Sequence, residues 1–385
     1  MLRESAAPGV GVLGSSPAVL RVLGVEDHHD YSSWLGAWRQ CADGDVFSHP
    51  AYLAERAGTH TTPRAVAFTD GRGSQVLYAF LQRPITHDAC GNAVPEGCYD
   101  LTTPLLYGGP LCSIAEGAEE SSVMTAFWDR FRPWARSEGI ISEFHRINPV
   151  TGGVASYPGT WREQAPHVVK RVGGKTYDEL LLDASKDFRR KIRRTREAGL
   201  ELRVDETGDD HDVFLHLYYE TMRRRCADAR FFYDHHFFTM MHETFEGQIT
   251  YLFAIAGGRP VSAEMALFCG ETGYAFLGAT EASSLATGAN SFLSHHAFLY
   301  AQSRGVKNYV LTGGVTNTED DSLLRFKLST AKTGRRDYFT AHQVIDDERY
   351  ARLSACNPES TFFPAYRAEG TVCSGRCSGG HEVRS

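Results

Sequence analysis

Long apolar runs are missing from this 385-residue sequence. No segment approaches the ~20 consecutive apolar residues that a membrane-spanning helix needs. The segment before residue 19 carries Glu4 and is interrupted by Gly and Pro, so it lacks the continuous apolar stretch of a signal peptide. The sequence therefore predicts a cytoplasmic protein without a membrane span.

Cysteine is present but shows no pattern. The nine cysteines form neither a CxxC pair nor the Cys/His spacing of a zinc site. An odd number without pattern predicts buried, reduced thiols. Those that lie among apolar neighbours are Cys41, Cys112, Cys226 and Cys269. Cys373 and Cys377 lie in a Gly/Ser-rich tail, residues 369–385, that is expected to be disordered.

Metal-ligand spacing is absent as well. His295 and His296 are consecutive residues on an expected helix, and no carboxylate lies at ligand spacing from them. We predict that they pack within the protein, and no metal site is expected.

The bulk composition predicts a globular protein, since 42% of the residues are hydrophobic and 23% are charged. The chain is long enough for two domains of ordinary size, each with its own core. A Gly/Pro/Ser-rich stretch at residues 148–159 separates the two halves. We expect a flexible N-terminus at 1–18, a first domain at 19–160 and a second domain at 161–341.

A concentrated run of basic residues lies near the middle of the chain. Residues 186–196 contain seven Lys or Arg, although the whole chain has a formal net charge of -7. An acidic protein that concentrates basic charge in one segment is predicted to bind an anion there. Charge alone leaves two interpretations open, a solvated helix face and an RNA phosphate site. The residues predicted to contact the anion are Lys186, Arg189, Arg190, Arg193, Arg194 and Arg196.

The same run has the spacing of an amphipathic helix, which gathers most of its arginines on one side. Phe188 and Ile192 are four residues apart and are expected to anchor the helix to a core. Gly199 is expected to end it.

The second half has a recognisable order of elements. Gly-containing turns join three apolar runs into an antiparallel meander, and helices and strands alternate after it. This is the order of a GNAT-type acyltransferase domain, an α/β (α+β) fold with a mixed, largely antiparallel sheet. The first half repeats it more loosely. The expected strands of the meander are 249–256, 261–268 and 274–279, and the elements after it are helix 290–304, strand 308–311, helix 322–329 and strand 336–341.

Several motifs resemble the Fem-type transferases, in an order that covers about residues 30 to 368. Asp320 to Lys327, preceded by Leu311-Thr312-Gly313-Gly314, is similar to the Phe-Lys segment of that family. Residues 99–110, expected to form a loop, and residues 141–149 are similar to its first domain. Residues 221–238 resemble its second-domain helix pair, and residues 362–367 resemble its C-terminal strand.

The resemblance implies two tandem GNAT-like domains, with residues 342–368 returning to the first domain. It implies transfer of an aminoacyl group from aminoacyl-tRNA to an amine, with aminoacyl-tRNA as co-substrate and no cofactor. The basic run would then contact tRNA. The acceptor would be a peptidoglycan precursor in cell-wall members, or a peptidyl or amino-sugar intermediate in antibiotic-pathway members, including pacidamycin-type assembly.

The sequence also departs from the family. Cell-wall members follow Phe-Lys with a Gly-rich run, whereas residues 328–334 read LSTAKTG here. No long helical-hairpin insertion is visible. Both differences favour a specialised acceptor, such as one in antibiotic biosynthesis.

The candidate catalytic residues are Lys327, Phe326 and Glu264. Lys327 lies beside Phe326 after a strand-end loop, where its ammonium would stabilise the oxyanion of aminoacyl transfer. Glu264 is a carboxylate within an apolar strand, so it either faces a cleft or forms a structural ion pair. In a cleft it would accept the proton of the acceptor amine or bind its ammonium.

The candidate acceptor-binding residues combine cationic and aromatic side chains. Adjacent arginines can clamp a phosphate or carboxylate, and a first-domain tyrosine would face the same cleft. These residues are Arg223, Arg224, Tyr233, Tyr107 and Arg146.

Two other functions remain open. An acyl-CoA-dependent N-acyltransferase needs a Gly-rich turn that binds pyrophosphate before a helix, but residues 284–290 keep a single glycine, with no basic residue ahead of it. A non-catalytic RNA-binding protein would keep the basic run without turnover.

Overall fold

The computed structural model describes residues 17–41, 45–58, 60–152 and 156–368. Its thirteen strands form one continuous sheet in the order β1-β2-β3-β4-β6-β13-β7-β12-β11-β10-β9-β8, and β5 pairs with β3. Of the strand pairs, β4 with β6 and β11 with β12 are parallel and the rest are antiparallel. The predicted mixed, largely antiparallel architecture is confirmed, but the two halves share one sheet.

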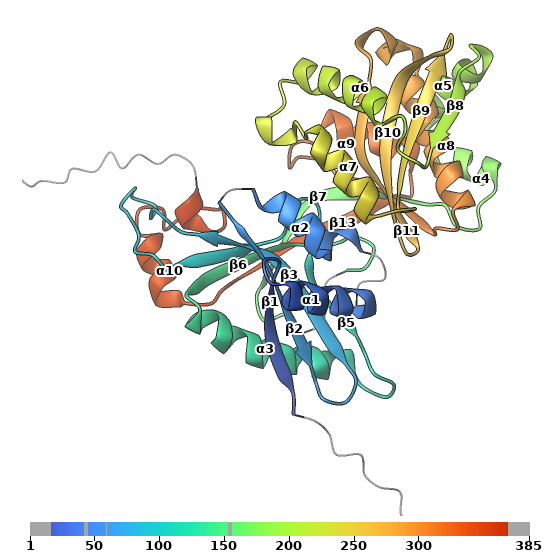
Figure 1. The fold of residues 1–385 in the computed structure, drawn as a ribbon. Coiled ribbons are helices and arrows are strands. Elements are labelled where there is room, and N and C mark those ends of the chain that lie inside the picture. Colours follow the sequence, from blue (N-terminus) through green and yellow to red (C-terminus); the bar gives the residue numbers. More distant parts are fainter. Residues whose placement is uncertain (1–16, 42–44, 59, 153–155, 369–385) are drawn as a thin grey trace, which may run out of the picture.

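The first half places helices on both faces of its strands (Figure 1). Its elements are β1 (Val19–Gly24), α1 (His28–Cys41), α2 (Pro50–Ala57), β2 (Thr62–Thr69), β3 (Gln75–Pro84), β4 (Tyr99–Thr102), β5 (Gly109–Ser113), α3 (Glu120–Ser137) and β6 (Ile140–Arg146).

The second half follows the predicted helix and strand order. Its elements are β7 (Thr160–Arg171), α4 (Tyr177–Leu182), α5 (Lys186–Glu197), β8 (Glu201–Asp205), α6 (His211–Arg224), α7 (His235–Thr244), β9 (Ile249–Ala256), β10 (Arg259–Cys269), β11 (Thr272–Thr280), α8 (Ala289–Ser303), β12 (Asn308–Thr312), α9 (Ser322–Thr330), β13 (Arg335–Val344) and α10 (Asp347–Leu353).

Two long strands join the halves. β13 pairs with β6 on one side and with β7 on the other, and β7 continues into pairing with β12. A large apolar core then combines residues of both halves, including Trp34, Phe47 and Tyr52 with Phe214 and Phe237. Figure 1 shows α2 beside α7 at this junction, where the two helices are in contact.

In each half, one strand stays paired with its neighbour over only part of its length or parts from the next strand of the sheet. β11 and β12 pair only over Thr272–Tyr274 and Asn308–Val310. In the first half β6 pairs with β4 and leaves β5 bonded to β3 alone. Strands that part in this way leave unpaired backbone groups and space between them.

Some expectations were wrong. The predicted loop at 99–110 contains β4 and the start of β5, because backbone pairing with β3 outweighs its turn-forming composition. Residues 362–367 form a bend and the 3-10 turn Ala365–Arg367 instead of a strand. Tyr366 and Arg367 still contact Asp100 of β4, so this segment lies against the first half.

The cysteine prediction also needs correction. Cys90 and Cys356 form a disulfide with a Cα–Cα distance of 5.4 Å, and Cys226 is exposed rather than buried. The 266-residue separation of the pair is invisible to spacing rules, because the fold alone brings the two residues together. Cys373 and Cys377 lie outside the described residues. Among the described helices, none is both long and apolar enough to cross a bilayer.

Candidate functional site

Lys327 is half-buried on α9, and its side chain reaches the C-terminal end of β12. Its Nζ donates to the Gly313 carbonyl at 2.6 Å and to Thr312 Oγ1 at 2.9 Å. Burial lowers the pKa of Lys327 to about 8, against the opposing effects of Glu264 and Asp321. The side chain therefore remains mainly cationic at neutral pH and presents its charge from a fixed position.

The loop before α9 is shaped by one carboxylate. Asp321 accepts hydrogen bonds from the backbone N–H groups of Val315, Thr316, Leu323 and Leu324, which both closes the loop and caps α9. These hydrogen bonds hold the pKa of Asp321 far below its usual range. A Cβ on Gly314 would lie 2.4 Å from Asp321 Oδ1, so this approach requires glycine.

Glu264 is buried on β10, and the Tyr309 hydroxyl of β12 donates to its Oε1. Burial raises the pKa of Glu264 to about 7, while Tyr309 and the charge of Lys327 act to lower it. Among the described residues it forms no ion pair within salt-bridge distance. Glu264 therefore has the properties of a group that exchanges a proton near neutral pH.

An aromatic cluster connects the Lys327 environment to the first half. The Tyr107 hydroxyl lies 2.8 Å from His167 Nδ1, and Tyr338 stacks on His167 with ring centroids 3.7 Å apart. His167 also closely approaches Gly313, since a Cβ there would lie 2.8 Å from His167 Cδ2. Burial first, and Lys327 second, lower the pKa of His167 to about 3, so it stays neutral.

A cavity of about 460 Å³ lies on the other side of Tyr107, between the two halves. It occupies the space where β5 and β6 part, and the β10–β11 turn of the second half closes it. His145 is one of its lining residues. His145 Nε2 lies 3.1 Å from Glu143 Oε1, whereas the buried Nδ1 has no hydrogen-bond partner within the described ranges. Further lining residues are Asp45, Gly109, Asn148, Tyr157 and Tyr274.

The predicted basic helix is confirmed as α5. Ser185 caps its start by accepting from the Phe188 N–H, and Gly199 follows its end with φ of 68°. Phe188 and Ile192 are buried, as predicted. Arg190 pairs with Asp187 and Arg189 donates to the Leu182 carbonyl. Over the described part of the chain, no such partner is found for the exposed cations Lys186, Lys191, Arg193, Arg194 and Arg196.

Phe326 connects the basic helix to Lys327. It packs against the small core formed by Ala184, Phe188 and Ile192, so its ring supports α5. The Ser185 N–H also donates to the Ser329 carbonyl at 2.8 Å. The exposed cations of α5 and the ammonium of Lys327 are therefore carried by two helices in direct contact.

The start of α8 lies against α5 as well. Gly288, with φ of 87°, precedes α8, and a Cβ there would lie 3.2 Å from Thr195 and 3.6 Å from Lys191. No basic residue directly precedes this turn in the sequence, because Lys191 is contributed by a different helix, α5.

The predicted acceptor residues do not form one group. Arg223 lies over the Tyr219 ring and Arg224 donates to Thr221 of its own helix. Tyr233 is buried beneath Arg56, in the core shared by the two halves.

Arg146 and Tyr107 lie nearer the cavity. Arg146 donates to Thr103 Oγ1 at 3.3 Å, and burial lowers its pKa. Tyr107 is the predicted residue that lines the cavity and also contacts the Lys327 environment through His167. His167 and Tyr309 were not predicted, because each lies within a strand and outside the residues that carry the family motifs.

Comparison with known proteins supports this architecture. Residues 183–327 match the family model described as an acetyltransferase (GNAT) domain. No curated protein matches the chain. The structure of FemX is similar at a TM-score of 0.60 and 13% identity, covering 84% of this chain and 98% of that one. The C-terminal domain (DUF2156) of a putative lysylphosphatidylglycerol synthetase from Agrobacterium fabrum is similar at a TM-score of 0.51 and 10% identity, covering 84% and 94%.

Because each likeness covers most of both chains, these structures share the overall fold of this chain. Identities this low concern the fold, and function has to be argued from the site. The GNAT-domain match supports acyl transfer as the reaction class. The chain therefore has the fold of two tandem GNAT-like domains.

Proposed function

We propose that this chain is a tRNA-dependent aminoacyltransferase that forms an amide between the aminoacyl group of a charged tRNA and the amine of a small acceptor. The observation that carries the proposal is the packing of Phe326 against Phe188 and Ile192. It sets the exposed cations of α5 beside the helix that holds Lys327. RNA bound along α5 would bring its esterified end toward that lysine.

The electrostatics of α5 support RNA over a small anion. Five exposed cations without a protein partner are spread along a 12-residue helix, which matches an extended row of phosphates. A small carboxylate or phosphate would need them to converge on one point. The chain as a whole has a net charge of -7, so this basic helix is the natural place for a polyanion to dock.

The chemistry assigned to Lys327 is charge stabilisation. The neutral amine attacks the ester carbonyl carbon, a C–N bond forms, and the carbonyl oxygen becomes an oxyanion. The Lys327 ammonium stabilises that oxyanion. The C–O bond to the ribose then breaks, the ribose hydroxyl receives a proton, and the amide leaves with the acceptor.

Glu264 is assigned the role of accepting a proton from the attacking amine. Its raised pKa, to about 7, lets its carboxylate accept the proton that the attacking amine loses. Tyr309 holds the carboxylate in place through its hydroxyl. Transfer of this proton from Glu264 to the ribose oxygen would balance the reaction.

The acceptor is assigned to the cavity between the halves. Tyr107 lines it and contacts His167, and His167 approaches the Gly313 segment whose carbonyl accepts from Lys327. A volume of about 460 Å³ accommodates a small peptidyl or amino-sugar molecule. The unpartnered His145 Nδ1 offers it a hydrogen bond. An acceptor from antibiotic biosynthesis fits this size.

One observation favours a second candidate, acyl-CoA-dependent N-acyl transfer. Lys191 lies beside Gly288 at the start of α8, and a helix start with an adjacent cation attracts phosphate. In this candidate, the ammonium of Lys191, whose Cβ and Cγ lie beside Gly288, would take the place of the basic residue that the sequence lacks at the turn.

The test measures transfer of a labelled acyl group from each donor to an amide product. Total tRNA charged with labelled amino acids is incubated with the protein and a panel of amino sugars and small peptides, and a parallel reaction contains labelled acetyl-CoA. Aminoacyl esters hydrolyse in mild base, whereas amides survive. The proposal expects base-stable label from charged tRNA that disappears after RNase treatment.

The other outcomes separate the alternatives. Base-stable label from acetyl-CoA alone would overturn the proposal in favour of the second candidate. Salt-sensitive tRNA binding without transfer to any amine on the panel would favour a non-catalytic RNA-binding protein. The Lys327→Met variant controls for uncatalysed aminolysis in each reaction.

A further inference from the structure

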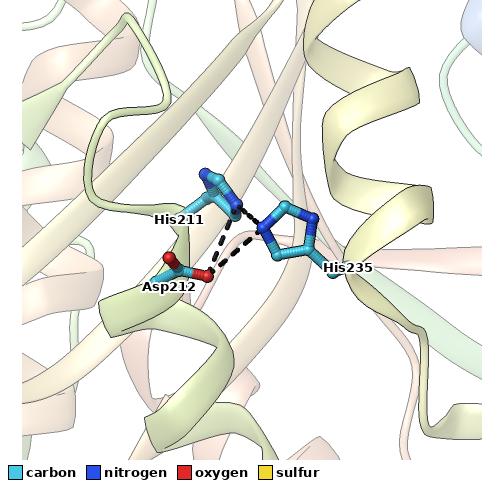
Figure 2. Close-up of side chains that lie close together, drawn as sticks. All are labelled: His211, Asp212 and His235. Atoms are coloured by element: carbon cyan, nitrogen blue, oxygen red, sulfur yellow. Dashed lines mark hydrogen bonds and ion pairs between the residues drawn. The ribbon is translucent and has the colours of Figure 1, made fainter.

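A cluster of two histidines and an aspartate lies at the surface of the second half, apart from the residues assigned to transfer. His211 and Asp212 begin α6, and His235 begins α7. Figure 2 shows the two imidazoles facing each other with the carboxylate beside them. His211 Nε2 lies 2.7 Å from His235 Nε2, and Asp212 Oδ1 lies 3.5 Å from each.

The hydrogen bonds of the two rings engage their Nδ1 atoms and leave both Nε2 atoms available to a cation. His211 Nδ1 lies 2.8 Å from the Gly208 carbonyl, which can only accept, so the proton of a neutral ring is on Nδ1. Thr239 donates its hydroxyl to the His235 carbonyl, and its oxygen lies 3.2 Å from His235 Nδ1, so that ring also donates from Nδ1. Both Nε2 atoms then direct lone pairs toward the same point.

We propose that His211, Asp212 and His235 bind a divalent transition-metal ion of the zinc class, which joins the first turns of α6 and α7. Imidazole nitrogens and one carboxylate oxygen suit zinc better than magnesium or calcium, which prefer oxygen ligands. The three candidate ligand atoms lie within 4.8 Å of one another. Water would complete the coordination, because Asp212 and His235 are 75% and 58% exposed.

The distances need only a small adjustment. Ligand bonds of about 2.0–2.2 Å in a tetrahedral arrangement separate ligand atoms by roughly 3.3 Å. The Asp212 distances of 3.5 Å are close to this separation, and the two nitrogens would move apart from 2.7 Å by roughly 0.6 Å.

The surroundings keep His211 in place. Asp205 accepts backbone hydrogen bonds from Thr207, Gly208 and Asp210, which braces the turn that supplies the Gly208 carbonyl. Helix starts carry partial positive charge that disfavours a cation. The nearby carboxylates Asp210 and Asp234 offset this effect.

The test uses the full chain stripped with a chelator and titrated with Zn²⁺ alone, followed by calorimetry and thermal unfolding. We expect one ion per chain and a melting temperature that rises with Zn²⁺. His235→Ala and Asp212→Asn should weaken binding by about tenfold or more and abolish the thermal shift. These ligands are exposed, so the variants should fold.

His216→Ala is the matched control, because His216 is an exposed histidine on the same α6 and pairs with Glu220, away from the proposed ligands. It should bind Zn²⁺ as the unmodified chain does. The proposal is overturned if the unmodified chain shows no binding, or if His235→Ala and Asp212→Asn both bind as tightly as the control. The latter result would place the metal at other side chains, which all the variants retain.

Discussion

The basic helix provides the sharpest quantitative prediction. Replacing Arg193 and Arg194 of α5 by alanine removes two of its five exposed cations that lack a protein partner. Alanine favours helix, and both side chains are exposed, so the fold should persist. The affinity for tRNA should decrease, and its dependence on salt should become shallower.

The magnitude follows from counterion release. Each neutralised phosphate contributes about -0.9 to the slope of log affinity against log salt, so five contacts give a slope of about -4.5. Raising salt from about 50 to 200 mM would then weaken binding by about 500-fold in the unmodified chain and by about 40-fold in the variant with three contacts. Arg190 is left out of the count because it pairs with Asp187.

The assay is fluorescence anisotropy of end-labelled tRNA at four salt concentrations. The matched control replaces Arg130 and Arg132, two exposed arginines on α3 of the first half, by alanine. The control should keep the slope of the unmodified chain. An unchanged slope in the α5 variant, or an equal change in the α3 control, would show that RNA does not follow α5.

Three further predictions concern the site. Lys327→Met should lower turnover by about 10²–10³-fold while circular dichroism stays unchanged, because it removes the charge at the oxyanion; an equal loss in Arg325→Met, an exposed change on the same helix, would contradict that role. Turnover should fall as pH drops through about 7, where Glu264 becomes protonated. Glu264→Gln should lower turnover and remove this loss of activity at acid pH in a pH–rate series. If the loss at acid pH persists in the variant, a group other than Glu264 causes it. Asp321→Ala should destabilise the fold by about 2 kcal/mol or more in urea unfolding, since the first-turn N–H groups lose their acceptor. Its pKa is lowered in the fold, so the stability it contributes is present above the unfolded pKa of about 3.9 and is lost as pH falls; the variant should lose stability less steeply in acid, and parallel curves would refute this.

Features encoded by neighbouring residues were predictable from the sequence. The α5 helix, its anchors Phe188 and Ile192 and its end at Gly199 followed from charge and spacing within fourteen residues. The meander β9–β10–β11 followed from apolar runs separated by Gly-containing turns. The strands β4 and β5 were missed because their short, turn-rich segments depend on pairing with β3.

The candidate site was predictable only in part. Lys327 was identified from its place in the Phe-Lys segment, and Glu264 from being a carboxylate in an apolar strand. The fold brings the two charges close enough to interact electrostatically. Phe326 was expected beside the reacting atoms, but its ring packs beneath α5. Tyr233 was expected to bind the acceptor, and burial instead places it in the core between the halves.

The sequence by itself determined the two-part GNAT-like pattern, the basic helix and the lysine segment, because hydrophobic period, charge and turn chemistry act over a few residues. Only the tertiary structure decided that β13 and β7 merge two sheets, that Lys191 stands beside Gly288, and that His211 meets His235. Such contacts depend on strand order and helix packing, which bring together residues that no local spacing relates.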